Sequence, residues 1–169
     1  MSEDRRRLAL RLEHRLRSTL MLLQESARRS GSEAMYDLAA EALRRAGGLA
    51  SAAVPPGGET RPVHLASAIM SALPGAACGG DRGLAASVPD GDLRTVLGLL
   101  PGWLGPDLSI TLRANPELLL MEISAPGPAP AMEVPEMGEP LIRILVEENL
   151  RGTLEVGEGA TAIIGLPAA

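Results

Sequence analysis

A histidine among arginines is the feature of this sequence best suited to chemistry. It lies in the run Glu13-His14-Arg15-Leu16-Arg17-Ser18-Thr19-Leu20. On a helix with about 100° per residue, His14 lies nearly opposite a stripe of leucines, and Arg11, Arg17 and Ser18 fall within about 60° of it. Neutral imidazole is a nucleophile near physiological pH, and arginine and serine can donate to phosphate oxygens. The pattern favours phosphoryl transfer; the alternative is a merely solvated helix face.

The composition excludes several other chemistries. All 16 basic residues are arginines, so no lysine is available for a Walker A loop, a Schiff base or a kinase-type strand. The single Cys78 excludes an internal disulfide framework and a cysteine-based zinc site. Only His14 and His64 could add imidazole ligands, and they lie far apart in the sequence. We therefore expect no metal and no cofactor.

Charge and hydropathy limit the partners. The net charge is −5, although residues 1–17 hold six arginines against three acidic residues. Aromatic stacking platforms are missing, since the chain has one Trp, one Tyr and no Phe, so we expect no nucleic acid. No apolar run approaches about 18 residues and no signal-peptide pattern begins the chain. These observations predict a cytoplasmic protein without membrane contact.

The first part of the chain, residues 1–54, reads as a helical hairpin. Leucines at helical spacing form one apolar stripe and predict a helix over 3–29, and a second apolar stripe predicts another over 33–53. The leucines of the first stripe are Leu8, Leu12, Leu16, Leu20, Leu22 and Leu23. Ser30-Gly31-Ser32 between them makes a tight break, which favours an antiparallel pair. Because a lone hairpin cannot bury two apolar stripes, we expect a homodimer that forms a four-helix bundle.

A linker rich in proline and glycine, residues 55–62, precedes an α/β domain over 63–169. We expect strands and helices that build a two-layer α/β sandwich with the helices on one face. The predicted elements are a helix over 63–73, a turn over 79–83, a strand over 83–88, a helix over 90–100, strands over 107–113 and 117–124, a helix over 138–149, and a hairpin of strands over 152–156 and 160–166. Trp103 either packs over a sheet end or marks a partner surface.

Taken together, these motifs resemble a sensor histidine-kinase core. The run from His14 to Leu20 is similar to the His-Arg-Val-Lys-Asn-Asn-Leu phosphoacceptor motif of one kinase subfamily. The end of the chain, from Leu141 to Pro167, is similar to the last helix and hairpin of the kinase ATP-binding domain. The resemblance covers nearly the whole chain and implies that fold.

The nucleotide machinery that this resemblance would imply is missing. The segment Leu93–Leu100 has no Asn to chelate Mg²⁺, and Ala125 stands where the family has the adenine-reading acid. The glycine-rich lid has shrunk to Met137-Gly138-Glu139-Pro140. Phosphoryl transfer from ATP needs a metal and donors that hold the phosphates. We therefore expect a degenerate ATP-binding domain without autokinase activity.

A chain that keeps the acceptor histidine but loses ATP binding resembles the histidine phosphotransferases of bacterial phosphorelays. This resemblance implies a phosphohistidine at His14, oriented by Arg11, Arg17 and Ser18, that exchanges phosphate with receiver-domain aspartates. The receiver would bring the Mg²⁺, and the kinase-like domain would help to dock it. Two alternatives stay open: a pseudo-kinase scaffold that binds response regulators without catalysis, and a divergent histidine kinase that still binds ATP.

Overall fold

The computed structural model describes residues 59–132 and 135–169, together with residues 3, 5, 7, 8, 10, 11, 14, 15, 18, 19, 21 and 22 near the N-terminus. The chain divides into two compact units, Met1–Pro55 and Pro56–Ala169. Among the described residues, no helix is both long enough and apolar enough to cross a bilayer.

Every described residue between Glu3 and Leu22 is helical, as the leucine spacing predicts. Leu8 of the predicted stripe is buried, but Leu22, which we counted in the same stripe, is 67% exposed. The buried stripe is narrower than predicted and leaves out Leu22, which lies about 90° from its centre on the helical wheel. The rest of the first helix, the second helix over 33–53 and the hairpin itself lie outside the described residues.

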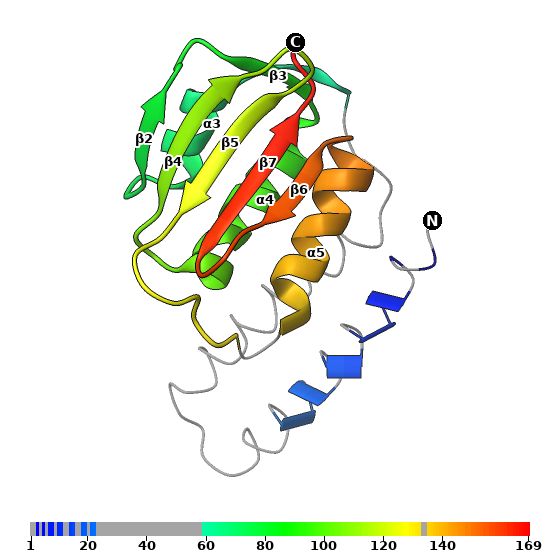
Figure 1. Cartoon of the computed structure of the whole chain (residues 1–169). Coiled ribbons are helices and arrows are strands. Elements are labelled where there is room, and N and C mark those ends of the chain that lie inside the picture. Colours follow the sequence, from blue (N-terminus) through cyan, green and yellow to red (C-terminus); the bar gives the residue numbers. More distant parts are fainter. Residues whose placement is uncertain are drawn as a thin grey trace. The chain divides into compact units, whose positions relative to one another are not determined.

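The second unit is built on a mixed five-stranded sheet in the order β2-β4-β5-β7-β6 (Figure 1). Its strands are β2 Ala77–Gly80, β4 Ser109–Ala114, β5 Leu119–Ser124, β6 Thr153–Val156 and β7 Thr161–Leu166. β2 runs parallel to β4, and all other neighbours are antiparallel. Alternate side chains such as Ile110, Met121 and Ile164 are fully buried, so one face of the sheet belongs to the core.

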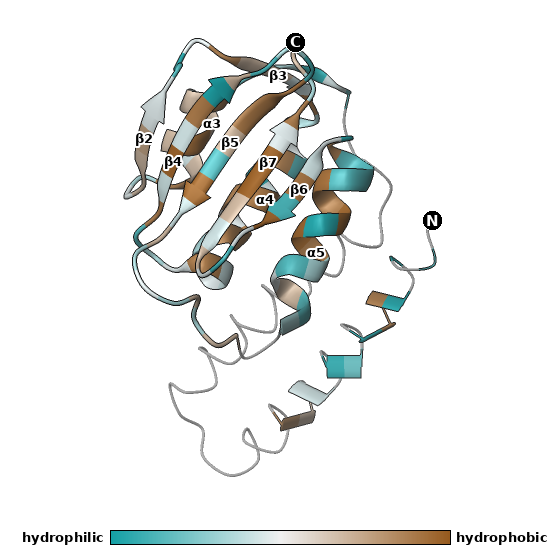
Figure 2. Ribbon diagram, viewed as in Figure 1, coloured by the Kyte–Doolittle hydropathy of each residue, from teal (hydrophilic) through white to brown (hydrophobic). Residues whose placement is uncertain are grey.

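Three helices cover that buried face: α3 Leu65–Ala72, α4 Asp90–Leu104 and α5 Glu139–Ile144, which continues as a π-helix over Leu145–Asn149 (Figure 1). Brown and teal alternate along α5 in Figure 2, which marks an amphipathic helix. Its Leu141, Ile142 and Leu145 are fully buried. The predicted two-layer sandwich, with helices on one face, is confirmed for this unit.

A two-stranded sheet corrects the predicted helix over 63–73. β1 Arg61–His64 pairs antiparallel with β3 Ala85–Val88, so the helix begins only at Leu65. Pro62 favours extended backbone for its neighbour Arg61, and Val63 is buried in the strand. His64 is exposed at the N-cap position, and its side chain makes no capping hydrogen bond.

The helix predicted over 90–100 continues to Leu104, past Pro101. Proline inside a helix removes one backbone hydrogen bond and costs about 3 kcal/mol. Trp103 and Leu104 are 9% and 1% exposed, and burying two large apolar side chains contributes about 1.5–3 kcal/mol each. Their burial explains why the helix extends beyond the proline.

The last two residues of β2, Gly79 and Gly80, correct the turn predicted over 79–83. Glycine has low strand propensity, so strand is not expected there from the sequence. Glycine is required where it stands, since Gly80 has φ +80° and a Cβ there would collide with the Leu112 carbonyl. The strand is set by its pairing with β4, which sequence propensity alone does not report.

An arginine contacts each outermost strand of the large sheet. The Arg82 Nη2 donates to the Cys78 carbonyl of β2 at 2.7 Å. The Arg143 Nη1 donates to the Leu154 carbonyl of β6 at 3.1 Å. Arg143 is itself held between Glu139 and Glu147, at 2.8 and 2.9 Å, and the hydrogen bond to Glu139 is the main reason that its pKa is raised.

Candidate functional site

His14 lies on the exposed side of the N-terminal helix. Arg11, His14 and Ser18 are all exposed, whereas Leu8 is 5% exposed. Residues three and four apart on a helix are neighbours, about 5–6 Å apart at their Cβ atoms. The helix therefore brings Arg11 and Ser18 next to His14. Arg17, the fourth predicted residue, lies outside the described residues.

Ser18 has a backbone partner in this structure. Its hydroxyl donates to the His14 carbonyl at 3.0 Å, a common arrangement for serine inside a helix. To donate to a phosphate oxygen, the hydroxyl hydrogen has to turn away from that carbonyl, by rotation about the Cβ–Oγ bond or about χ1. Arg7 is also engaged, since its Nε lies 3.2 Å from the Glu3 carboxylate on a solvent-exposed part of the helix. Such exposed pairs contribute little to stability.

Two apolar side chains on the same exposed side were missed by the sequence reasoning. Leu10 is 58% exposed and Met21 is 65% exposed. On the helical wheel they lie about 40° and 20° from His14, so the angle itself could have identified them. His14 thus stands on a surface that combines a cation, a hydroxyl and apolar groups.

In the second unit, the C-terminal end of α4 lies against parts of the connection between β5 and α5, at Ala125, Met132 and Gly138. A Cβ added at Gly105 would lie 3.4 Å from the Ala125 Cβ. A Cβ added at Gly138 would lie 2.5 Å from the Met132 Sδ and 3.2 Å from the Trp103 Cδ1. Trp103 is therefore a packing residue of the helical layer, not a partner surface.

Two positions at which the sequence departs from the nucleotide-binding pattern of the kinase family lie in this region. α4 contains no Asn, and Ala125 directly follows β5. Its backbone N–H donates to the Ala160 carbonyl at 3.0 Å. Within the described ranges, no group of three or more His, Cys, Asp or Glu side chains could hold a metal ion.

Asp90, at the first position of α4, joins three elements of this unit. Its carboxylate accepts from Arg94 and from Arg61 of β1, each at 3.1 Å. Arg94 also donates to the Ser71 hydroxyl of α3 at 3.1 Å. The hydrogen bond from Arg94 is the largest cause of a lowered Asp90 pKa, and Arg61 adds to it.

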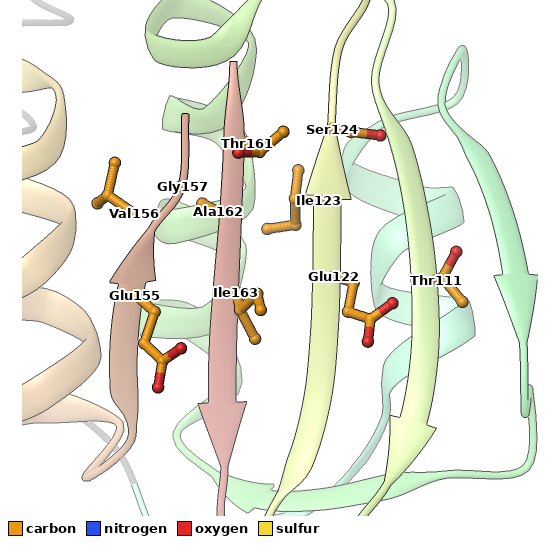
Figure 3. Close-up of a pocket in the computed structure, with 10 residues that line it drawn as sticks. All are labelled: Thr111, Glu122, Ile123, Ser124, Glu155, Val156, Gly157, Thr161, Ala162 and Ile163. Atoms are coloured by element: carbon orange, nitrogen blue, oxygen red, sulfur yellow. The ribbon is translucent and has the colours of Figure 1, made fainter. Parts of the chain in front are cut away.

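A hollow of about 380 Å³ lies on the sheet face turned away from the helices (Figure 3). The strand register places Thr111, Glu122, Ile163 and Glu155 side by side in one row across β4, β5, β7 and β6. The full lining is Thr111, Glu122, Ile123, Ser124, Glu155, Val156, Gly157, Thr161, Ala162 and Ile163. None of these residues was singled out from the sequence, because only the register brings them together.

Comparison with solved structures settles the fold. The chain matches the histidine kinase AdeS of Acinetobacter baumannii with a TM-score of 0.68 and 13% identity, over 91% of this chain and 97% of that one. It also matches two nucleotide-free crystal forms of the catalytic domain of the histidine kinase ThkA. Their TM-scores are 0.50 and 0.51, each at 14% identity over 65% of this chain and 96% of that domain.

The α/β unit has a histidine-kinase-like fold. No family model matches the sequence, and no curated protein matches it either. The histidine-kinase-like core predicted from the sequence is therefore confirmed as a fold, by structures that share little sequence with it. The helical hairpin and the four-helix bundle stay predictions.

Proposed function

We propose that this chain is a histidine phosphotransferase of a bacterial two-component phosphorelay, active in the cytoplasm as a homodimer. The observation that carries the proposal is the exposure of His14 beside Arg11, on a chain whose α/β unit has a histidine-kinase-like fold. A receiver domain would dock on the His14 surface, where Leu10 and Met21 add apolar area. The hairpin of residues 1–54 would form the dimer.

In the proposed step, an unprotonated ring nitrogen of His14 attacks the phosphorus of a receiver's aspartyl phosphate. The P–N bond forms as the P–O bond to the aspartate breaks, and the aspartate leaves as a carboxylate. The other ring nitrogen can then lose its proton. A second receiver's aspartate reverses the step. Mg²⁺ would come with the receiver, and Arg11 and Arg17 would balance the charge of the moving phosphoryl group.

The proposal includes the absence of autokinase activity. It is supported by the packing of Trp103 against Gly138 and Met132, by Ala125 at the end of β5, and by an α4 helix without Asn. Phosphoryl transfer from ATP requires groups that hold the metal and the phosphates. A divergent kinase is the second candidate, because the neighbouring structures are histidine kinases.

Transfer from a radiolabelled, phosphorylated receiver domain tests the function. We expect the wild-type chain to take up label and His14→Ala to lose it by at least 1,000-fold, since no other residue would supply the nucleophile. His64→Ala removes the other histidine, which is exposed on β1, and should transfer normally. Undiminished transfer by His14→Ala would contradict the phosphotransferase.

Titration with an ATP analogue and Mg²⁺ separates the two enzyme candidates. We expect no saturable binding in calorimetry up to millimolar nucleotide. Saturable binding, with label from ATP appearing on His14, would instead establish the divergent kinase. If the wild-type chain neither binds a receiver domain nor transfers phosphate, both enzyme candidates are wrong. If it binds a receiver domain without transferring phosphate, the result favours the pseudo-kinase scaffold.

A further inference from the structure

The open face of the large sheet carries a surface that the proposed phosphotransfer does not use. In the part of the chain that the structure describes, all three helices of the α/β unit lie on the opposite face (Figure 1). The hollow of about 380 Å³ lies over β5, β7 and β6, and its central row is Glu122, Ile163 and Glu155 (Figure 3).

The lining of this hollow carries negative charge, of which one carboxylate has an arginine partner and the other has none among the described residues. Glu122 and Glu155 are the only charged residues in its lining. Glu122 has one partner, Arg113, whose Nε lies 3.4 Å from the carboxylate and whose side chain is 65% exposed. The Glu155 side chain is exposed and makes no hydrogen bond or ion pair with the described residues. A ligand with a positive charge therefore complements the charge of this hollow.

The centre of the hollow is apolar. Ile163 is half-buried between the two glutamates, whose backbones are about 10 Å apart across two strand spacings. Next to this row, Leu118 lies over Gly165, where an added Cβ would be 2.9 Å from the Leu118 Cδ1. A ligand that fits has an apolar stem and a cationic end. Arginine has both, and its guanidinium donates to carboxylates in a planar fork.

We propose that this hollow is a docking surface for an arginine-bearing basic segment of a partner protein. The arginine stem would lie on Ile163 and its guanidinium would donate to Glu122 and Glu155. The same face of a second copy is a poor occupant, because a symmetric contact would bring like carboxylates together. The surface is independent of His14, so it stands whether or not the phosphotransferase does.

The test is an NMR titration of the full-length ¹⁵N-labelled chain with the peptide acetyl-Gly-Leu-Arg-Leu-Gly-amide. We expect amide shifts that cluster at Thr111, Glu122, Glu155 and Ile163. Glu122→Gln combined with Glu155→Gln should raise the Kd at least fivefold, and so should 0.5 M NaCl, because both remove the charge attraction. The peptide with Gln in place of Arg should give no clustered shifts.

Glu117→Gln is the matched control, since Glu117 is exposed in the β4–β5 turn and lies outside the hollow. It should bind the peptide as the wild type does. Glu155→Gln alone keeps the test valid if the double variant fails to fold, because this side chain has no partner to lose. Shifts spread over the surface, an unchanged Kd in the glutamine variants, or reduced self-association of those variants would each overturn the proposal.

Discussion

The exposed face of the N-terminal helix and the helical layer of the α/β unit use their side chains in opposite ways. On the helix, the side chains of Arg11 and His14 are exposed and make no hydrogen bond or ion pair with the described residues. In the α/β unit, Asp90 is held by two arginines, and Trp103 is buried against Gly138. Groups left available for a partner are thus separated from groups committed to packing.

This contrast teaches where chemistry is possible in a chain with a histidine-kinase-like fold. A site that transfers a group needs side chains that can reach a ligand, and the helix face offers them. At the C-terminal end of α4, Trp103 and Met132 instead lie close to Gly138.

The largest expected effect on stability tests the role of Trp103 as a packing residue. Replacing Trp103 by Ala should lower the free energy of unfolding by about 3–5 kcal/mol, because it leaves a cavity under the connection to α5. Urea unfolding followed by circular dichroism measures this. A loss below about 1 kcal/mol would mean that the indole is not a core group. The statement that the α/β unit uses this side chain for packing would then be wrong.

A smaller effect is expected at Gly138. Gly138→Ala should destabilise the unit by about 1–3 kcal/mol, since the new methyl group would press on Met132 and Trp103. Gly98→Ala is the matched control: Gly98 is exposed inside α4 with open space around it, and alanine should stabilise the helix by about 0.5–1 kcal/mol. In thermal unfolding, Gly138→Ala should therefore lower the stability and Gly98→Ala should raise it. Equal changes in the two variants would contradict the close approach at Gly138.

On the helix face, Arg11→Ala should slow transfer from a phosphorylated receiver by about tenfold without a change in stability. The expected loss corresponds to one charge-assisted hydrogen bond weakened by solvent, about 1.4 kcal/mol. Arg15→Ala, about 100° away from His14 on the same helix, should keep nearly the full rate. Equal losses in both variants would show that net charge, and not the position of Arg11, matters.

The smallest effect concerns pH. Because the Asp90 pKa is lowered in the folded unit, chiefly by the hydrogen bond from Arg94, the ionised carboxylate stabilises the fold above the unfolded pKa of about 4. That contribution is lost as the pH falls through the folded pKa. Asp90→Asn should therefore cost at most about 1 kcal/mol at pH 7 and nothing near pH 2. A cost that persists unchanged at low pH would assign the effect to something other than this charge.

Sequence patterns predicted the helices and strands that are determined by residues close together in the sequence. The apolar spacing of α4 and the glycine turn between β6 and β7 gave those elements within a few residues. β1 and β2 were missed because their strand character comes from distant partners, β3 and β4. Position around the helix located His14 correctly on an exposed surface, whereas the role of Ser18 depends on a rotamer that the sequence does not contain.

The arginines on the two outermost strands have a consequence for how this unit meets other molecules. An unpaired strand edge invites backbone pairing with a foreign strand, which leads to fibres or to domain exchange. Here an incoming strand must first displace Arg82 from Cys78 or Arg143 from Leu154, and Arg143 is also anchored by two glutamates. Recognition is thereby directed toward side chains on the faces of the unit, and crowded solutions of the protein gain resistance to aggregation.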